Sequence, residues 1–291
     1  MKMMIWIALM GLGMAASGQQ PTLNDAVARA DTHPLPVTNI GIFHLARAPE
    51  QGILTLGHVP AGTQRLVIDG REVHFAPDGT FAIGFDRDYA TTVLISAFQP
   101  NGAVVSERLP VRKHAWQISH LPATTRNPVS DADFQARRPA EIAQIVAARA
   151  NVSDAFGWRQ HFIWPAHGRV SDLFGSQRIY GTLPAAPHGG VDVAIPQGTP
   201  IVAPAQGIVV LAADHPFTLE GNLLMVDHGM SVNSAFLHMS RILVHKGDVV
   251  HQGQLLGYSG MTGRATGPHL HWAMKWMAER VDPMSLTGPM R

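Results

Sequence analysis

The sequence predicts a mainly β protein in which a small all-β domain and a larger β domain are joined by a helix. Two observations predict this class. Short apolar runs alternate with turn-forming residues over most of the chain, and 17 of the 28 glycines lie in residues 151–291, where they separate many such runs. Regular short strands with glycine-rich turns are typical of antiparallel sheets and barrels.

The composition excludes several classes of protein. The chain has 291 residues, no cysteine and 16 histidines, with 22 basic and 21 acidic side chains. Without cysteine, a disulfide scaffold, an iron–sulfur cluster and a cysteine nucleophile are impossible. A formal charge of +1 argues against binding nucleic acid through bulk electrostatics.

The first 18 residues have the pattern of a secretory signal peptide. Lys2 precedes an apolar run of about 14 residues, and small residues follow from Ala15 to Gly18. A membrane-spanning helix needs about 20 residues, so we expect a cleaved signal and export. If the signal stays uncleaved, it would instead anchor the protein to the membrane.

Residues 19–123 are predicted to form the N-terminal β domain, a small sandwich. Two short runs that contain apolar residues, 65–68 and 71–75, flank Asp69-Gly70. Asp-Gly between two such runs is a strong hairpin signal, because both turn positions favour positive φ. Residues 91–98 are rich in β-branched side chains and are predicted to form a further strand.

Residues 124–160 are predicted to be a linker and a connecting helix. The helix is expected over residues 139–150, with Pro139 at its first position, where the missing N–H costs nothing. Ile142, Ile145, Val146 and Arg149 follow at helical spacing. We expect this face to pack against one of the β domains.

Two motifs in residues 161–291 have the spacing of metal ligands. In a strand, His269 and His271 would point to the same side, so that one could bind a metal and the other stand beside a metal-bound water. His188 and Asp192 flank Gly189 and Gly190, which let the backbone bend tightly. Two histidines, one aspartate and a water would form a zinc site with an open position, which is typical of catalytic zinc.

At these residues the chain resembles peptidase family M23, the LytM or lysostaphin-type zinc endopeptidases of peptidoglycan. The family pattern His-x-x-x-Asp matches His188 and Asp192, and the family His-x-His matches His269 and His271. The resemblance extends over about residues 164–283. It implies a LytM-like antiparallel, barrel-like catalytic domain over residues 161–291. The N-terminal domain is similar, more weakly, to an accessory β domain of some proteobacterial members.

The resemblance also implies roles for five residues. The ligands of one zinc ion per chain would be His188, Asp192 and His271, and the catalytic histidines would be His238 and His269. Met239 stands where the family usually has leucine. We expect His269 to act as the general base and His238 to orient water or stabilise the oxyanion, although the sequence leaves the order of these roles open.

The implied function is zinc-dependent hydrolysis of peptide cross-links in bacterial peptidoglycan, in the periplasm or cell envelope. The expected partner is the peptide stem of the cell wall, with no nucleic acid, and a protein partner could bind the N-terminal domain. A first alternative is a noncatalytic LytM-type factor that binds and regulates another wall hydrolase. A second is a lipoyl-like carrier around residues 244–250, although Met274-Lys275-Trp276 lacks the context of a modified lysine. Whether residues 19–150 inhibit the site also stays open.

Overall fold

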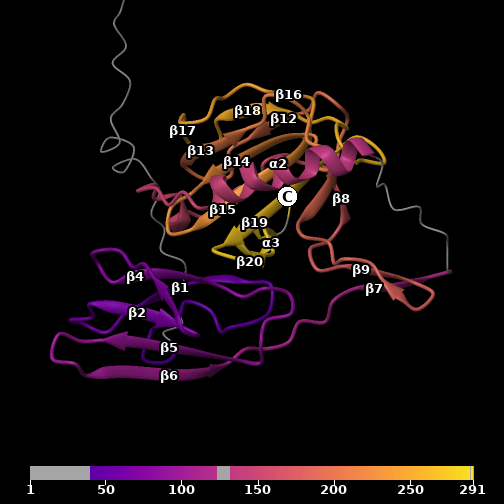
Figure 1. Cartoon of the computed structure of the whole chain (residues 1–291). Coiled ribbons are helices and arrows are strands. Elements are labelled where there is room, and N and C mark those ends of the chain that lie inside the picture. The colour runs from indigo at the N-terminus through magenta and orange to yellow at the C-terminus, as the bar shows by residue number, and fades with distance from the viewer. Residues whose placement is uncertain (1–39, 123–131, 289, 291) are drawn as a thin grey trace, which may run out of the picture. The chain divides into compact units, whose positions relative to one another are not determined.

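The computed structural model describes residues 40–122, 132–288 and 290, and the predicted signal peptide lies outside them (Figure 1). Strands, nearly all in antiparallel pairs, are the main regular structure of the described chain, which confirms the predicted fold class. No helix within the described ranges is long and apolar enough to cross a membrane.

The N-terminal strands form two antiparallel sheets. Strand β1 (Leu54–His58) pairs with β4 (Thr80–Gly84), and a four-stranded sheet has the order β3 (Arg71–Val73), β2 (Arg65–Ile68), β5 (Thr92–Phe98) and β6 (Val104–Pro110). The predicted hairpin is confirmed: Asp69 and Gly70 join β2 to β3 with φ of 45° and 80°.

The C-terminal part is built on an eight-stranded sheet. Its order is β17 (Val249–Val250), β13 (Gly207–Ala212), β14 (Asn222–Asp227), β15 (Val232–Met239), β19 (His269–Trp276), β11 (Val191–Ala194) and β8 (Arg169–Asp172), with β20 (Glu279–Val281) also paired to β19. A second sheet contains β12 (Pro200–Val202), β18 (Leu255–Tyr258) and β16 (Arg241–Ile242).

A third, three-stranded sheet joins the two parts of the chain. Strand β7 (Ile118–Leu121) runs parallel to β9 (Gln177–Tyr180), which pairs in turn with β10 (Leu183–Pro184). Two short helices complete the described chain, a 3₁₀ helix at Gly157–Arg159 and α3 at Met284–Thr287.

The two faces of strand β19 differ in burial: one faces the core, and the other, called the open face here, is only partly covered. Leu270, Trp272, Met274 and Trp276 are buried, whereas the odd-numbered residues between them are only partly buried. Because side chains alternate along a strand, His269, His271, Ala273 and Lys275 share the open face.

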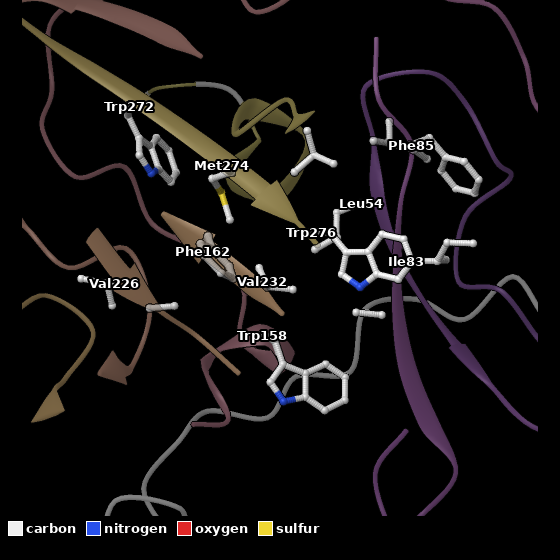
Figure 2. Packing of buried hydrophobic residues seen from close by; sticks show 14 of the residues in the cluster. Leu54, Ile83, Phe85, Trp158, Phe162, Val226, Val232, Trp272, Met274 and Trp276 are labelled. Carbon is white, nitrogen blue, oxygen red and sulfur yellow. The ribbon is translucent and has the colours of Figure 1, made fainter. Parts of the chain in front are cut away.

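The core continues from the C-terminal part into the N-terminal strands. Trp276 of β19 is 1% exposed and belongs to the same buried cluster as Leu54, Ile83 and Phe85, as Figure 2 shows. A Cβ atom on Gly84 would lie 2.8 Å from Cβ of Trp276, so the glycine allows the close approach. The predicted domain boundaries at 18, 123 and 160 stay predictions.

The helix is longer than predicted. Helix α2 spans Ala132–Arg149, so Pro139 lies inside it rather than at its start. Proline cannot donate to the carbonyl four residues earlier. Contacts of the preceding turn hold the helix together there, because Arg137 donates to the carbonyl of Pro216 and Arg138 pairs with Glu220.

The buried face of α2 agrees with the prediction only in part, because Ile145 is buried but two other predicted residues are not. Ile142 and Val146 are 46% and 60% exposed, whereas Glu141, Ile145 and Ala148 are buried. Glu141 turns inward because its carboxylate accepts hydrogen bonds from the backbone and hydroxyl of Thr218. The apolar contacts of α2 are made with β13, β14 and β15, on the open face of the large sheet.

Candidate metal centre

Two neighbouring strands bring the predicted motifs together. Asp192 of β11 lies directly opposite His271 of β19, and His188 is in the turn that leads into β11. Gly190 makes this close approach possible. A Cβ atom there would lie 2.4 Å from the carbonyl oxygen of Trp272 and 2.8 Å from Nε2 of His271.

Three potential ligand atoms converge at this point. Nε2 of His188 is 3.0 Å from Nδ1 of His271 and 3.2 Å from Oδ1 of Asp192. Nδ1 of His271 is 2.8 Å from the same carboxylate oxygen. Two neutral imidazoles and a carboxylate at these separations fit a tetrahedral metal ion such as zinc, with the fourth position left open.

The ring of His188 is oriented by a carbonyl in the loop after β8. Its Nδ1 lies 3.0 Å from the carbonyl oxygen of Leu173. Since a carbonyl only accepts hydrogen bonds, Nδ1 carries the proton and Nε2 keeps a lone pair toward the centre. This second contact fixes the tautomer that a metal ligand requires.

The charges of the cluster shift the pKa values of its members. Burial lowers the pKa of His188, but the hydrogen bond and charge of Asp192 outweigh burial and raise it. The pKa of Asp192 is lowered, because both histidines outweigh the opposing effect of burial. Burial dominates at His271 and lowers its pKa. A carboxylate that stays ionised between two histidines favours a bound cation.

The other two predicted histidines lie beside the three. The rings of His238 and His269 are 4.7 Å apart, and Nε2 of His269 is 3.8 Å from Oδ1 of Asp192. Nδ1 of His238 donates to the carbonyl of Thr262, and Nδ1 of His269 donates to that of Gly267. Both rings therefore keep an unprotonated Nε2 when neutral.

A β-bulge directs His238 into the site. Asn222 and Leu224 of β14 face Met239 and Phe236 of β15, so β15 carries one extra residue between these pairs. His238 lies in this interval with a φ of 62°, which is unusual for a residue other than glycine. In a regular strand it would share the core face of Phe236; the bulge turns it toward His269.

One buried histidine lies on the core side of β19. His228 is fully buried, with Nδ1 2.9 Å from the carbonyl of Gln206 and Nε2 2.8 Å from the hydroxyl of Ser234. The same hydroxyl accepts the indole N–H of Trp272. Complete burial lowers the pKa of His228 to about 4, so the neutral ring is a structural part of the sheet.

All five predicted site residues thus lie together, and the sequence missed their supports. The carbonyls of Leu173, Thr262 and Gly267 orient three of the rings. Backbone acceptors leave no side-chain signal in a sequence. The five other histidines of this part are exposed and lie outside the cluster: His161, His167, His215, His245 and His251.

The part of the chain that carries the cluster has known relatives. Residues 186–283, which include all five site residues and the strands between them, match the model of peptidase family M23. The C-terminal part of this protein belongs to peptidase family M23.

Curated relatives match the M23 domain over part of their length. Peptidoglycan DD-endopeptidase ShyA from Vibrio cholerae is 42% identical over 123 residues, which are 42% of this chain and 28% of that protein. DD-carboxypeptidase/endopeptidase Mpg from Neisseria meningitidis is 36% identical over 102 residues, 35% of this chain and 23% of that protein. The match therefore spans less than a third of either relative.

The likeness to a solved structure extends beyond the M23 domain. A crystal structure of a protein assigned to peptidase M23, from Pseudomonas aeruginosa, is 28% identical with a TM-score of 0.66. The alignment covers 83% of this chain and 96% of that one. This coverage is too large for the C-terminal part alone, so the shared fold includes N-terminal strands.

Proposed function

We propose that this protein is a zinc-dependent endopeptidase that hydrolyses peptide cross-links of bacterial peptidoglycan. One observation carries the proposal: Nε2 of His188, Oδ1 of Asp192 and Nδ1 of His271 converge within 3.2 Å of one another, beside two further histidines. The relatives named as peptidoglycan DD-endopeptidases support the substrate class.

The proposed ligands are His188, Asp192 and His271, holding one zinc ion per chain. When bound, zinc supplies a Lewis acid that acidifies water and polarises a peptide carbonyl. The chain supplies the rest. Asp192 provides negative charge at the site, and the Leu173 carbonyl holds the tautomer of His188.

His269 is proposed as the general base. Its Nε2 is unprotonated in the neutral ring, and the side chain is 15% exposed at the edge of the cluster. A base in this position takes the proton of the attacking water and returns it to the leaving amine.

His238 is proposed to orient the attacking water. Burial lowers its pKa to about 4, and the neighbouring His269 and His271 act in the same direction. A neutral His238 whose Nδ1 proton is held by Thr262 accepts a hydrogen bond at Nε2. Its low pKa makes it a weaker proton acceptor than an ordinary histidine, which leaves the base role to His269.

A digest of purified peptidoglycan tests the activity. Zinc-loaded protein is incubated with the wall or with cross-linked muropeptides, and the products are identified by mass spectrometry. Loss of cross-linked dimers with gain of uncross-linked stems supports the proposal. An unchanged digest with zinc bound would instead favour the noncatalytic wall-hydrolase regulator.

The proposed location is the cell envelope. The predicted signal at residues 1–18 and the cell-wall enzymes among the relatives support export to the periplasm. Cross-links through meso-diaminopimelate are the proposed target. Fractionation of cells that produce the full chain checks the location.

A further inference from the structure

A pocket of about 380 Å³ opens beside the candidate metal centre. It lies between α2 and the open face of the large sheet, and His271 is part of its lining. The apolar part of its wall includes Ile142 and Val146 from the helix and Ala273 from β19. Both helix residues are large apolar side chains that α2 leaves exposed, at 46% and 60%.

The charged side chains that line this pocket are unbalanced. They comprise four cations, Arg138, Arg149, Lys275 and Arg280, but Glu220 is the single acid. Arg138 makes two hydrogen bonds of 2.6 and 2.9 Å to Glu220. The two residues therefore neutralise each other, and three cations remain to be balanced.

One of the three is balanced from outside the pocket. Arg280 of β20 donates its backbone N–H and its Nε to Asp86 of the N-terminal part, at 2.9 and 3.2 Å. Among the described residues, Arg149 and Lys275 have no carboxylate within 4 Å. Carboxylates farther away act on both, Glu220 on Arg149 and Asp86 and Glu279 on Lys275, but neither cation forms a direct ion pair within the described chain.

Both unbalanced cations are partly withdrawn from water. Nε of Arg149 is buried and has no hydrogen-bond partner within the described chain. Nζ of Lys275 donates only to the carbonyl of Ala278, 3.2 Å away. Burial, followed by the charges of Arg149 and Arg280, lowers the pKa of Lys275. Two cations that repel each other in a part-buried pocket are costly unless an anion joins them.

We propose that Lys275 and Arg149 form a subsite for a carboxylate group of the peptide substrate. This proposal rests on the proposed function and names the chemistry that the same cleft recognises. Lys275 follows His271 by four residues on one face of β19, which places its Cα about 13 Å along the strand. The subsite therefore holds a carboxylate within a few residues of the bond that is cut.

The surroundings of the pocket strengthen the attraction between a bound carboxylate and the two cations, compared with the same groups in open solvent. Its apolar walls keep the local dielectric low, which strengthens the attraction between a carboxylate and two cations. Arginine presents a planar donor group that matches a carboxylate, and lysine adds a second positive charge. In a peptide stem, the carboxylate comes either from the cross-linking diamino acid or from the chain terminus.

Binding to an inactive protein tests the subsite separately from catalysis. Zinc-loaded His269→Ala protein is titrated calorimetrically with three forms of a cross-linked stem peptide. One keeps all carboxylates, one is amidated at the diamino acid, and one is amidated at the C-terminus. We expect one of the two amides to bind about tenfold more weakly than the free acid, which identifies the source of the carboxylate.

Substitutions in the same background connect the discrimination to the two cations. Lys275→Met and Arg149→Met are expected to weaken binding of the free acid about tenfold while leaving the discriminated amide nearly unchanged. Lys275→Arg keeps the charge and is expected to retain binding. Lys246→Met removes an exposed lysine elsewhere and serves as the matched control. Melting temperature and zinc content establish that each variant is folded.

The results separate this proposal from the proposed activity. Equal affinity for the acid and both amides, an equal loss for all three in Lys275→Met, or no measurable peptide binding overturns the subsite. If the wild-type protein cleaves cross-links but does not discriminate between the acid and the amides, the proposed activity stands and the proposed subsite is refuted. If the wild-type protein discriminates between the acid and the amides but cleaves no cross-link, the subsite stands and the proposed activity is refuted.

Discussion

Asp192 and His271 face each other across β11 and β19, with Oδ1 of the carboxylate 2.8 Å from Nδ1 of the imidazole. This cross-strand pair fixes the centre of the site, because the register of the two strands is set by buried residues on either side. Val191 and Trp272, the next pair along, are both fully buried. A shift of one residue in either strand would move the ligand of that strand into the core.

Removing a ligand and removing the base should have different effects. We expect His188→Ala to lose zinc and all activity. His269→Ala should keep zinc and lose activity by about 10²–10⁴-fold, since general-base catalysis contributes about that much. Metal analysis and muropeptide hydrolysis measure the two effects. Full activity with one zinc per chain in His188→Ala would refute the ligand assignment.

Chelation should abolish hydrolysis reversibly. Incubation with a chelator and removal of the complex leaves the three ligand atoms within 3.2 Å of one another without a cation between them. We expect activity to return on addition of zinc and the melting temperature to rise with it, because zinc binds the folded state. Hydrolysis that persists after the metal is removed contradicts this prediction.

Gly190→Ala should damage the centre without touching a ligand. Its Cβ would lie 2.4 Å from the backbone of Trp272 and 2.8 Å from the ring of His271, so β11 and β19 must separate. We expect weaker zinc binding and a lower melting temperature. Gly189→Ala is the control for these two measurements, because its Cβ meets only the side chain of Arg280 at 3.8 Å.

The buried ring of His228 should make stability depend on pH. Its pKa is lowered to about 4 in the folded state, whereas an unfolded histidine titrates near about 6.5. Below a pH of about 6.5, His228 of the unfolded chain binds a proton, whereas the buried ring of the folded chain stays neutral until the pH nears 4. The free energy of unfolding should therefore fall by about 3 kcal/mol as pH drops from about 6.5 to 4.

Urea denaturation at several pH values measures this dependence. His228→Gln is expected to be less stable at pH 7 and to lose the part of the slope that His228 contributes. If the mutant keeps the full slope, other groups cause it. His245→Gln, at an exposed position, is the control and should leave the slope unchanged.

Trp276→Ala should destabilise the whole described chain. The side chain is 1% exposed and packs in a cluster that contains residues of the N-terminal strands (Figure 2). We expect a loss of about 3–5 kcal/mol, as for other buried aromatic side chains. Thermal unfolding measures the loss, with Leu183→Ala as a control because Leu183 is 73% exposed. A loss below about 1 kcal/mol would show that the cluster is loosely packed.

The sequence by itself determined the fold class, the Asp69-Gly70 hairpin and the two motifs, His188 with Asp192 and His269 with His271, that meet at the site, whereas His238 was implied only by the family resemblance. Local patterns suffice for these features, because alternation defines a strand, Asp-Gly defines a turn, and His-x-His places two rings on one face. The ligand spacing of His188 and Asp192 is also local, since both residues belong to one turn and the strand that follows it.

Tertiary structure alone decided how α2 and His238 are placed. Helical spacing predicted Ile142, Ile145 and Val146 on the buried face. Glu141 turns inward instead to accept hydrogen bonds from Thr218, so that only Ile145 of the three is buried and the other two line the pocket. The bulge in β15 turns His238 to the open face, against the alternation of the strand. In each case a partner distant in sequence outweighs the local pattern, and those partners can be identified only once the chain has folded.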